Sequence, residues 1–238
     1  MTATKDKKEK AAFSLPTVEE LIKAGVHLGH KKSKWNPKMS PFILKQKNGV
    51  HLINVEKTIV KLEEALNFLV ETVKAGGEIL FVGTKSPVKS LIKQTAEELG
   101  APYVTERWLG GTLTNAKTIL KRLEYFRNLE IKKNSPLEWA KYTKKERLDM
   151  EKELSKLEHK LGGLKKLEKI PAAIFIIGVK EASVAVKEAA AKKVPLVAVC
   201  DTNANPTEID YVIPANDDSL SSARLILDKV KEAISAAK

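Results

Sequence analysis

Five short runs rich in apolar residues, separated by segments with helical periodicity, constrain the fold of this chain more than any other feature. The runs lie at 79–82, 103–105, 172–177, 196–200 and 211–213. Uninterrupted apolar runs are typical of strands in a parallel sheet that is covered on both faces. Strands that alternate with helices of ordinary length predict an α/β fold with such a sheet between helical layers.

Capping residues indicate where several helices begin. Thr17 and Glu20 have the spacing of a capping box, which predicts a short helix near the N-terminus. Ser86 and Pro87 are typical of an N-cap and a first helical position directly after the first apolar run. Longer helices are expected at about 55–74, 87–99, 182–192 and 219–236.

Residues 113–169 differ in character, because charged side chains dominate and apolar ones recur only at spacings of three and four. The spaced apolar residues are Ile119, Leu123, Phe126, Met150, Leu154, Leu157, Leu161 and Leu164. So narrow a seam is typical of a coiled coil. Capping sequences at 135–138 and 143–146 predict two helix starts. We interpret the segment as an antiparallel coiled-coil hairpin that projects from the body, rather than as two ordinary core helices.

These patterns predict how the chain is divided. An α/β body would be formed by two stretches, with the helical hairpin inserted between them and a flexible basic tail ahead of them. The predicted ranges are 15–112 and 170–238 for the body, 113–169 for the hairpin and 1–14 for the tail.

The net charge of +12 is distributed unevenly along the chain. Residues 1–50 and 113–169 each carry +7, whereas 51–112 and 170–238 each carry −1. Positive charge that is confined to particular segments indicates an extended polyanionic partner such as a nucleic acid. The alternative is a set of lysine-rich faces that contact only water.

Several classes of protein are disfavoured by composition. No uncharged apolar run approaches the roughly 18–20 residues of a membrane span, so no membrane partner is expected. Residues 1–10 contain Lys with Asp6 and Glu9 but no apolar stretch, unlike a secretory signal. The single cysteine, Cys200, can form no internal disulfide, which fits a reducing compartment. A cytoplasmic protein is the expectation.

Motifs for catalysis are absent from the sequence. The turn at 83–86 follows a strand and resembles a phosphate loop, but it lacks the earlier glycine that a Walker loop requires. Cys200 has no candidate base near it in sequence, and the residues 201–205 that follow are typical turn formers. We therefore expect no catalytic residues, no cofactor and no small-molecule substrate. A nucleotide- or phosphate-handling α/β enzyme with a helical arm stays open as the alternative.

His27 and His30 are the best candidates for a metal site, although weak ones. Their spacing would bring them to one face if the segment were helical. No third ligand is evident nearby, because His51 stands in another element. The expectation is that no metal binds and that both side chains make ordinary polar contacts or contact RNA.

Two segments have residue types that suit RNA. In the first, Lys31, Lys32, Lys34 and Lys38 surround Trp35 and Asn36. Lysines can contact phosphates, the indole can stack on a base or ribose, and the amide can donate or accept hydrogen bonds. The second segment, 107–115, contains a Gly-Gly pair that permits close approach of another backbone.

These segments also carry a family resemblance. Residues 24–30, 35–39, 79–85 and 107–115, together with 201–203, 209–214 and 216–218, resemble the motifs of the bacterial-type small-subunit ribosomal protein S-two family, in order along essentially the whole chain. The resemblance implies a flavodoxin-like three-layer body with an inserted coiled-coil hairpin. It also implies a structural role in the small (30S) ribosomal subunit, with 16S rRNA and neighbouring ribosomal proteins as partners, including the large S-one protein where it exists.

The candidate RNA-binding residues are chosen by residue type within the basic segments. They are Lys31, Lys32, Lys34, Trp35, Asn36, Lys38, Arg107, Thr114, Asn115, Lys117, Lys121, Arg122, Lys144, Lys145 and Arg147.

Overall fold

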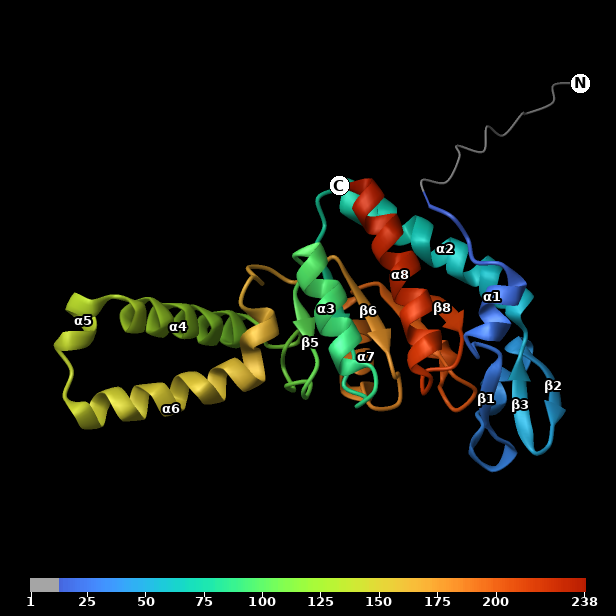
Figure 1. Ribbon diagram of the computed structural model, residues 1–238, viewed down its shortest axis with the longest axis horizontal. Helices are drawn as coiled ribbons and strands as arrows, with labels where there is room; N and C mark the ends of the chain where they lie inside the picture. Colours follow the sequence, from blue (N-terminus) through green and yellow to red (C-terminus); the bar gives the residue numbers. More distant parts are fainter. Residues whose placement is uncertain (1–12) are drawn as a thin grey trace, which may run out of the picture.

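A computed structural model describes residues 13–238, so most of the predicted N-terminal tail lies outside the described residues. Five parallel strands form the central sheet in the order β5-β4-β6-β7-β8 (Figure 1). They are β4 (Ile79–Val82), β5 (Tyr103–Val104), β6 (Ala173–Ile177), β7 (Leu196–Cys200) and β8 (Tyr211–Pro214). This is the strand order of flavodoxin-like folds. The predicted α/β fold with a parallel sheet is confirmed.

Alternate residues of the strands pack into two separate hydrophobic clusters, one on each face of the sheet. Phe81 and Phe175 lie in one cluster with residues of the helices α2 (Val55–Lys74), α3 (Lys89–Leu99) and α8 (Leu220–Ala237). Leu80 and Ile174 lie in the opposite cluster with α7 (Ser183–Lys192). Every position of β4, β6 and β7 is buried, which accounts for their uninterrupted apolar sequences.

A second, smaller sheet near the N-terminus was not predicted. Helix α1 (Val18–Lys23) precedes β1 (Leu28–Lys31), β2 (Ile43–Lys47) and β3 (Val50–Ile53), which pair antiparallel in the order β1-β3-β2. Strand β2 is exposed over most of its length, so its sequence shows no alternation of apolar and polar residues. The sequence signal for this sheet was the pair Asn48-Gly49, which is typical of a tight hairpin turn. Both residues have positive φ, as such a turn requires.

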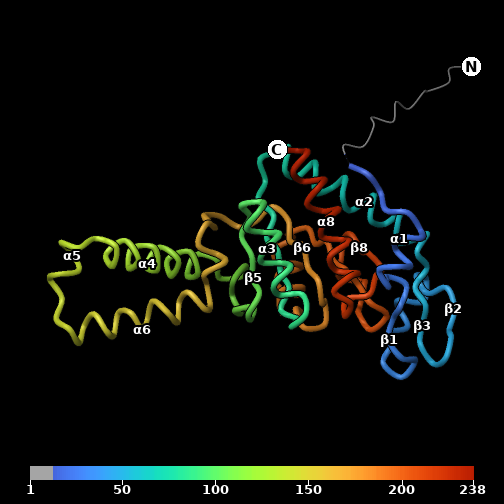
Figure 2. The backbone as a smooth tube through the Cα atoms, viewed as in Figure 1, coloured from blue at the N-terminus to red at the C-terminus, as the bar shows by residue number. Residues whose placement is uncertain are grey.

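The charged segment forms two long helices, α4 (Ala116–Asn134) and α6 (Lys144–Leu161), joined by the short α5 (Pro136–Ala140). They extend side by side away from the sheet (Figures 1 and 2). Several of the spaced apolar residues are buried, namely Leu123, Phe126, Leu157, Leu161 and Leu164. They belong to the same cluster as Leu80 and Trp108 of the body. Regular coiled-coil packing and the exact domain limits stay predictions.

One predicted helix start is wrong, and one predicted capping box does not form although its helix begins where expected. Thr17 and Thr143 do form their capping boxes. In contrast, Ser86 and Pro87 lie in a turn, and α3 begins only at Lys89, without a side-chain cap. Ser135 is the N-cap of α5 but makes no side-chain cap hydrogen bond, and the Glu138 carboxylate pairs with Lys141 at 2.5 Å. In the second case, the carboxylate expected to complete the box is engaged in a local ion pair.

Because the hairpin shares its hydrophobic core with the body, a substitution that disrupts the core of the hairpin should also destabilise the sheet. Phe126 is fully buried, and the ammonium of Lys165 lies 4.7 Å from the centre of its ring. Phe126→Ala should lower the free energy of unfolding by about 3–5 kcal/mol. Ile131→Ala, at a side chain that is 65% exposed, should change it by less than about 0.5 kcal/mol. Urea unfolding measures both.

Hydrogen exchange of the β4 amides distinguishes one folding unit from two. Faster exchange in β4 of the Phe126→Ala protein is expected. Destabilisation confined to the hairpin, with unchanged exchange in β4, would contradict a shared core.

Candidate nucleic-acid interface

The first basic segment is held rigidly against the carboxyl edge of the parallel sheet. The backbone N–H of Asn36 donates to the carbonyl of Thr202 at 2.7 Å, and that of His30 donates to the Thr202 hydroxyl at 2.8 Å. A Cβ at Gly29 would lie only 2.5 Å from Cγ2 of Thr202, so glycine is needed for this close approach. The segment is therefore part of the folded scaffold and not a free loop.

The lysines of this segment project outward from that support. Lys31, Lys32, Lys34 and Lys38 are all exposed. Within residues 13–238 none of the four forms an ion pair, and Lys38 makes one hydrogen bond, to the hydroxyl of Thr207 at 3.2 Å. The folded chain therefore leaves their positive charge uncompensated by its own described carboxylates.

Trp35 and Asn36 are half-buried, and both have structural contacts. The Trp35 ring lies against His51, with the ring centroids 4.9 Å apart. The side-chain oxygen of Asn36 accepts the N–H of Lys38 at 3.0 Å and so caps the 3-10 helix Pro37–Phe42. Only part of each side chain is available to another molecule.

At the root of the hairpin, the buried carboxylate of Glu188 organises the 107–115 segment. Its Oε1 accepts from the indole N–H of Trp108 at 3.2 Å and the backbone N–H of Gly111 at 2.7 Å. Its Oε2 accepts from the N–H groups of Leu113 and Thr114 at 2.9 and 3.1 Å, and from the Thr114 hydroxyl at 3.2 Å. Gly111 has a φ of +94°, which glycine adopts without strain. Glu188 was not among the residues predicted from sequence.

Burial by itself raises the pKa of Glu188, but the hydrogen bonds from Gly111, Leu113, Thr114 and Trp108 outweigh it, so that the net pKa is lowered. The side chain is 8% exposed and is held ionised by donors aimed at it. The negative charge lies beneath the loop, while Arg107 beside it is exposed.

The remaining candidates do not form one patch. Thr114, Asn115, Lys117 and Lys121 are exposed near the start of α4. An open groove along this helix is lined by Lys117, Lys121 and Arg127, with Glu124 and Glu168 among them. Arg122 pairs with Glu153 of α6, which compensates its charge.

Lys144, Lys145 and Arg147 lie at the far end of the hairpin, where α6 begins. Both lysines are exposed. Arg147 is half-buried and donates to the carbonyl of Ala140 at 3.1 Å. These three residues lie at the tip of the hairpin, away from the candidates at its root.

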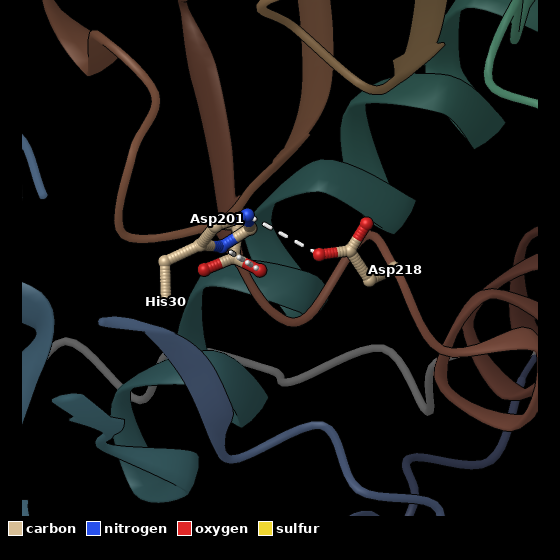
Figure 3. A group of neighbouring side chains, drawn as sticks. All are labelled: His30, Asp201 and Asp218. Carbon is tan, nitrogen blue, oxygen red and sulfur yellow. Dashed lines mark ion pairs between the residues drawn. The ribbon is translucent and has the colours of Figure 1, made fainter. Parts of the chain in front are cut away.

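A polar cluster lies beside the first basic segment, at the carboxyl edge of the sheet (Figure 3). Nδ1 of His30 is 3.1 Å from Oδ2 of Asp201, and Nε2 is 3.2 Å from Oδ2 of Asp218. The ammonium of Lys85 lies 2.7 Å from Asp217 and 2.5 Å from Asp218. The expectation that His27 and His30 share a helical face is wrong, because His30 is in β1 and His27 is in the preceding turn.

The burial of these carboxylates affects their protonation. Burial raises the pKa of Asp217 to about 6, and the hydrogen bond from Lys85 opposes this shift. The Asp201 carboxylate raises the pKa of His30, against the effect of burial. The shift of His30 indicates negative charge around the ring, whereas that of Asp217 mainly reflects its burial.

The geometry of the 83–86 turn does not suit a phosphate. Lys85 is engaged by two carboxylates, and α3 begins only after the turn. Cys200 is fully buried, and burial raises the pKa of its thiol, so a nucleophilic role has no support.

Comparison with known proteins assigns the chain to a family. The family model described as Ribosomal protein S2 matches residues 21–237. This chain belongs to the ribosomal protein S2 family. It is 46% identical over 224 residues to the small ribosomal subunit protein uS2 of Roseiflexus sp. (strain RS-1), covering 94% of this chain and 85% of that protein. The uS2 protein of Salinispora arenicola (strain CNS-205) is 44% identical over 222 residues, covering 93% and 80% respectively.

Membership of the ribosomal protein S2 family confirms the resemblance in the sequence and decides against the enzyme alternative, since the family is structural and not catalytic. Between residues 13 and 238, no helix has the length and apolar character needed to cross a membrane.

Glu188→Gln tests whether the carboxylate of Glu188 stabilises the root of the hairpin. The substituted amide would turn an NH₂ group toward backbone donors, which should cost about 1–3 kcal/mol of stability. Glu71→Gln, at an exposed position of α2, is the matched control and should change stability by less than about 0.5 kcal/mol. Urea unfolding at neutral pH measures the difference.

The pH dependence follows from the lowered pKa of Glu188. The stabilisation by the carboxylate is fully present above its ordinary value of 4.5 and is lost as pH falls through the lower value in the folded protein. The difference in the free energy of unfolding between the native and Glu188→Gln proteins should therefore become smaller as the pH is lowered. A difference that stays constant down to the acid transition would mean that the charge of Glu188 does not contribute to stability.

Proposed function

We propose that this protein, a structural constituent of the small (30S) ribosomal subunit, binds small-subunit rRNA through two separate cationic surfaces on a near-neutral body. The first surface comprises Lys31, Lys32, Lys34 and Lys38 with the exposed parts of Trp35 and Asn36. The second comprises Arg107, Thr114, Asn115, Lys117 and Lys121 at the hairpin root. The observation that supports this most strongly is the exposure of lysines without ion-pair partners among the described residues, on a fixed backbone.

Lysines on a backbone that is held in place are suited to phosphate binding for a physical reason. Contacts to phosphates position a protein on RNA, and each releases condensed counterions. The first surface is anchored through Thr202, so little backbone ordering has to accompany binding there. Trp35 can add stacking only at its exposed edge, since His51 covers part of it.

The hairpin extends the reach of the second surface. Helix α4 has 19 residues, which at about 1.5 Å per residue corresponds to roughly 28 Å. Lys144, Lys145 and Arg147 at the tip can thus contact a different RNA element from Lys117 and Lys121 at the root. The body-and-hairpin division of the chain is the organisation that this role requires.

Neighbouring proteins of the small subunit are the second class of partner in this proposal, with the large S-one protein among the candidates. Exposed apolar side chains supply surface for such contacts. Ile22, Leu44 and Leu137 are 49%, 60% and 83% exposed respectively. Protein interfaces use such side chains where they can be buried by a partner.

The double variant Lys32→Glu/Lys34→Glu tests the first surface. Binding to small-subunit rRNA should weaken, because the glutamates repel the phosphates that the lysines attract. The slope of log affinity against log salt should become less steep by about 0.7–0.9 for each phosphate that the variant no longer neutralises. Fluorescence anisotropy at several salt concentrations measures both quantities.

Lys74→Glu/Lys192→Glu is the matched control, because both lysines are exposed and lie in the last turns of α2 and α7, outside the two surfaces. It has the same net charge as the test variant. An equal loss of affinity in the two double variants would contradict the proposed location, and a flat salt dependence would contradict phosphate binding.

A further inference from the structure

The cluster of His30, Asp201 and Asp218 has the composition of a cation site. One ring nitrogen and one carboxylate oxygen from each Asp lie within 4.8 Å of one another. The residues come from β1, the end of β7 and the turn after β8, which meet at the carboxyl edge of the sheet (Figure 3). Ligands of open α/β sheets bind at this edge.

A buried oxygen in this cluster has no hydrogen bond. Asp201 is 1% exposed, and its Oδ1 accepts from the N–H and hydroxyl of Thr202 at 2.5 and 3.0 Å. Its Oδ2 lies 3.1 Å from Nδ1 of His30 and, unless that ring is protonated, has no hydrogen-bond donor among the described residues. An ionised oxygen that is buried without a partner is costly, so a bound cation would relieve this cost.

The net charge of the cluster also favours a bound cation. Asp201, Asp217 and Asp218 provide three carboxylates, and Lys85 is the cation that pairs with two of them. With His30 neutral, the excess of two negative charges matches one divalent ion. The exposed lysines of the first basic surface begin at Lys31, directly after His30.

We propose that His30, Asp201 and Asp218 bind a divalent cation of the Zn²⁺ or Mn²⁺ class, which clamps the first basic segment to the carboxyl edge of the sheet. Imidazole nitrogen with carboxylate oxygens is a donor set that suits these ions. The ion joins β1 to two loops that are distant in sequence, and it cancels negative charge beside a surface that binds phosphates.

The surroundings of His30 fit this role. Nδ1 faces the buried oxygen of Asp201, so it is the nitrogen that binds the ion. Nε2 then carries the proton, and it loses its present acceptor, Oδ2 of Asp218 at 3.2 Å, when that carboxylate turns to bind the ion. The side-chain amide of Asn203 lies 3.1 Å from Nε2, and its Oδ1 is otherwise buried without a partner among the described residues. Rotating this amide by half a turn places the oxygen toward Nε2, giving the second hydrogen bond that metal-binding histidines usually make.

Isothermal titration of the chelator-treated full chain with ZnCl₂, and separately with MnCl₂, tests the proposal. One saturable site is expected for at least one ion, together with a rise in the unfolding temperature. Asp218→Asn should weaken the affinity by about 10–100-fold. Asp218 is 53% exposed, so this variant is expected to fold, which circular dichroism checks.

Two control variants separate this site from adventitious binding. Asp228→Asn removes an exposed carboxylate of α8 and should leave the affinity unchanged. His159→Gln removes an exposed imidazole that lies 3.8 Å from Glu106, which is another place where zinc could bind weakly.

The ¹⁵N spectrum of the histidine rings supplies an independent readout, and a shift of the His30 Nδ1 resonance on titration is expected. The proposal is overturned if neither ion gives saturable binding, if Asp218→Asn binds as tightly as the native chain, or if His159→Gln alone abolishes binding. The cluster would then be an imidazolium held between two carboxylates.

Discussion

The parallel sheet is buried on both faces, and this constraint decides where the chain can interact with other molecules. Every residue of β6 and β7 is buried, so neither strand offers a side chain to solvent. Groups that contact a partner must therefore lie at the ends of the strands, on the outer faces of the surrounding elements or in an insertion. The first basic segment occupies the carboxyl edge, and the hairpin leaves the body after β5 and returns before β6. Both cationic regions therefore lie outside the buried sheet.

Two buried carboxylates connect these regions to the core. Glu188 accepts five hydrogen bonds from the 108–114 segment, so its desolvation is offset by donors. Asp201 is satisfied only through one oxygen, by Thr202, while the other faces His30. The hairpin root is thus closed by protein groups alone, whereas the attachment of the first basic segment has the composition of a site completed by a cation. In each case a negative charge inside the protein fixes a surface that carries positive charge outside.

The parts of the fold that were predictable from sequence are those in which burial imposes a local pattern. The strands at 79–82 and 196–200 were identified because each is apolar throughout, and Gly100 ends α3 with a φ of +65°, as expected after Leu99. The small sheet was missed because β2 is exposed and bears no pattern.

The site residues that were missed depend on long-range contacts. Glu188 sits in an Ala-rich helix, where nothing local distinguishes it from a solvent-exposed glutamate. Asp201 and Asp218 meet His30 only in the folded chain, so no spacing in sequence could link them. The exposure of the lysines was predictable because it follows from their charge and local sequence, whereas their contact with RNA stays a prediction.

Lysine acetylation, compared by mass spectrometry between the free protein and the assembled small subunit, tests the two-surface account most directly. If both surfaces contact rRNA, the following lysines should react readily in the free chain and become protected in the subunit: Lys31, Lys32, Lys34, Lys117 and Lys121. Lys74 and Lys192, which are exposed outside both surfaces, should lose much less reactivity. Equal reactivity of the first group in the two states would contradict the claim that these lysines contact rRNA.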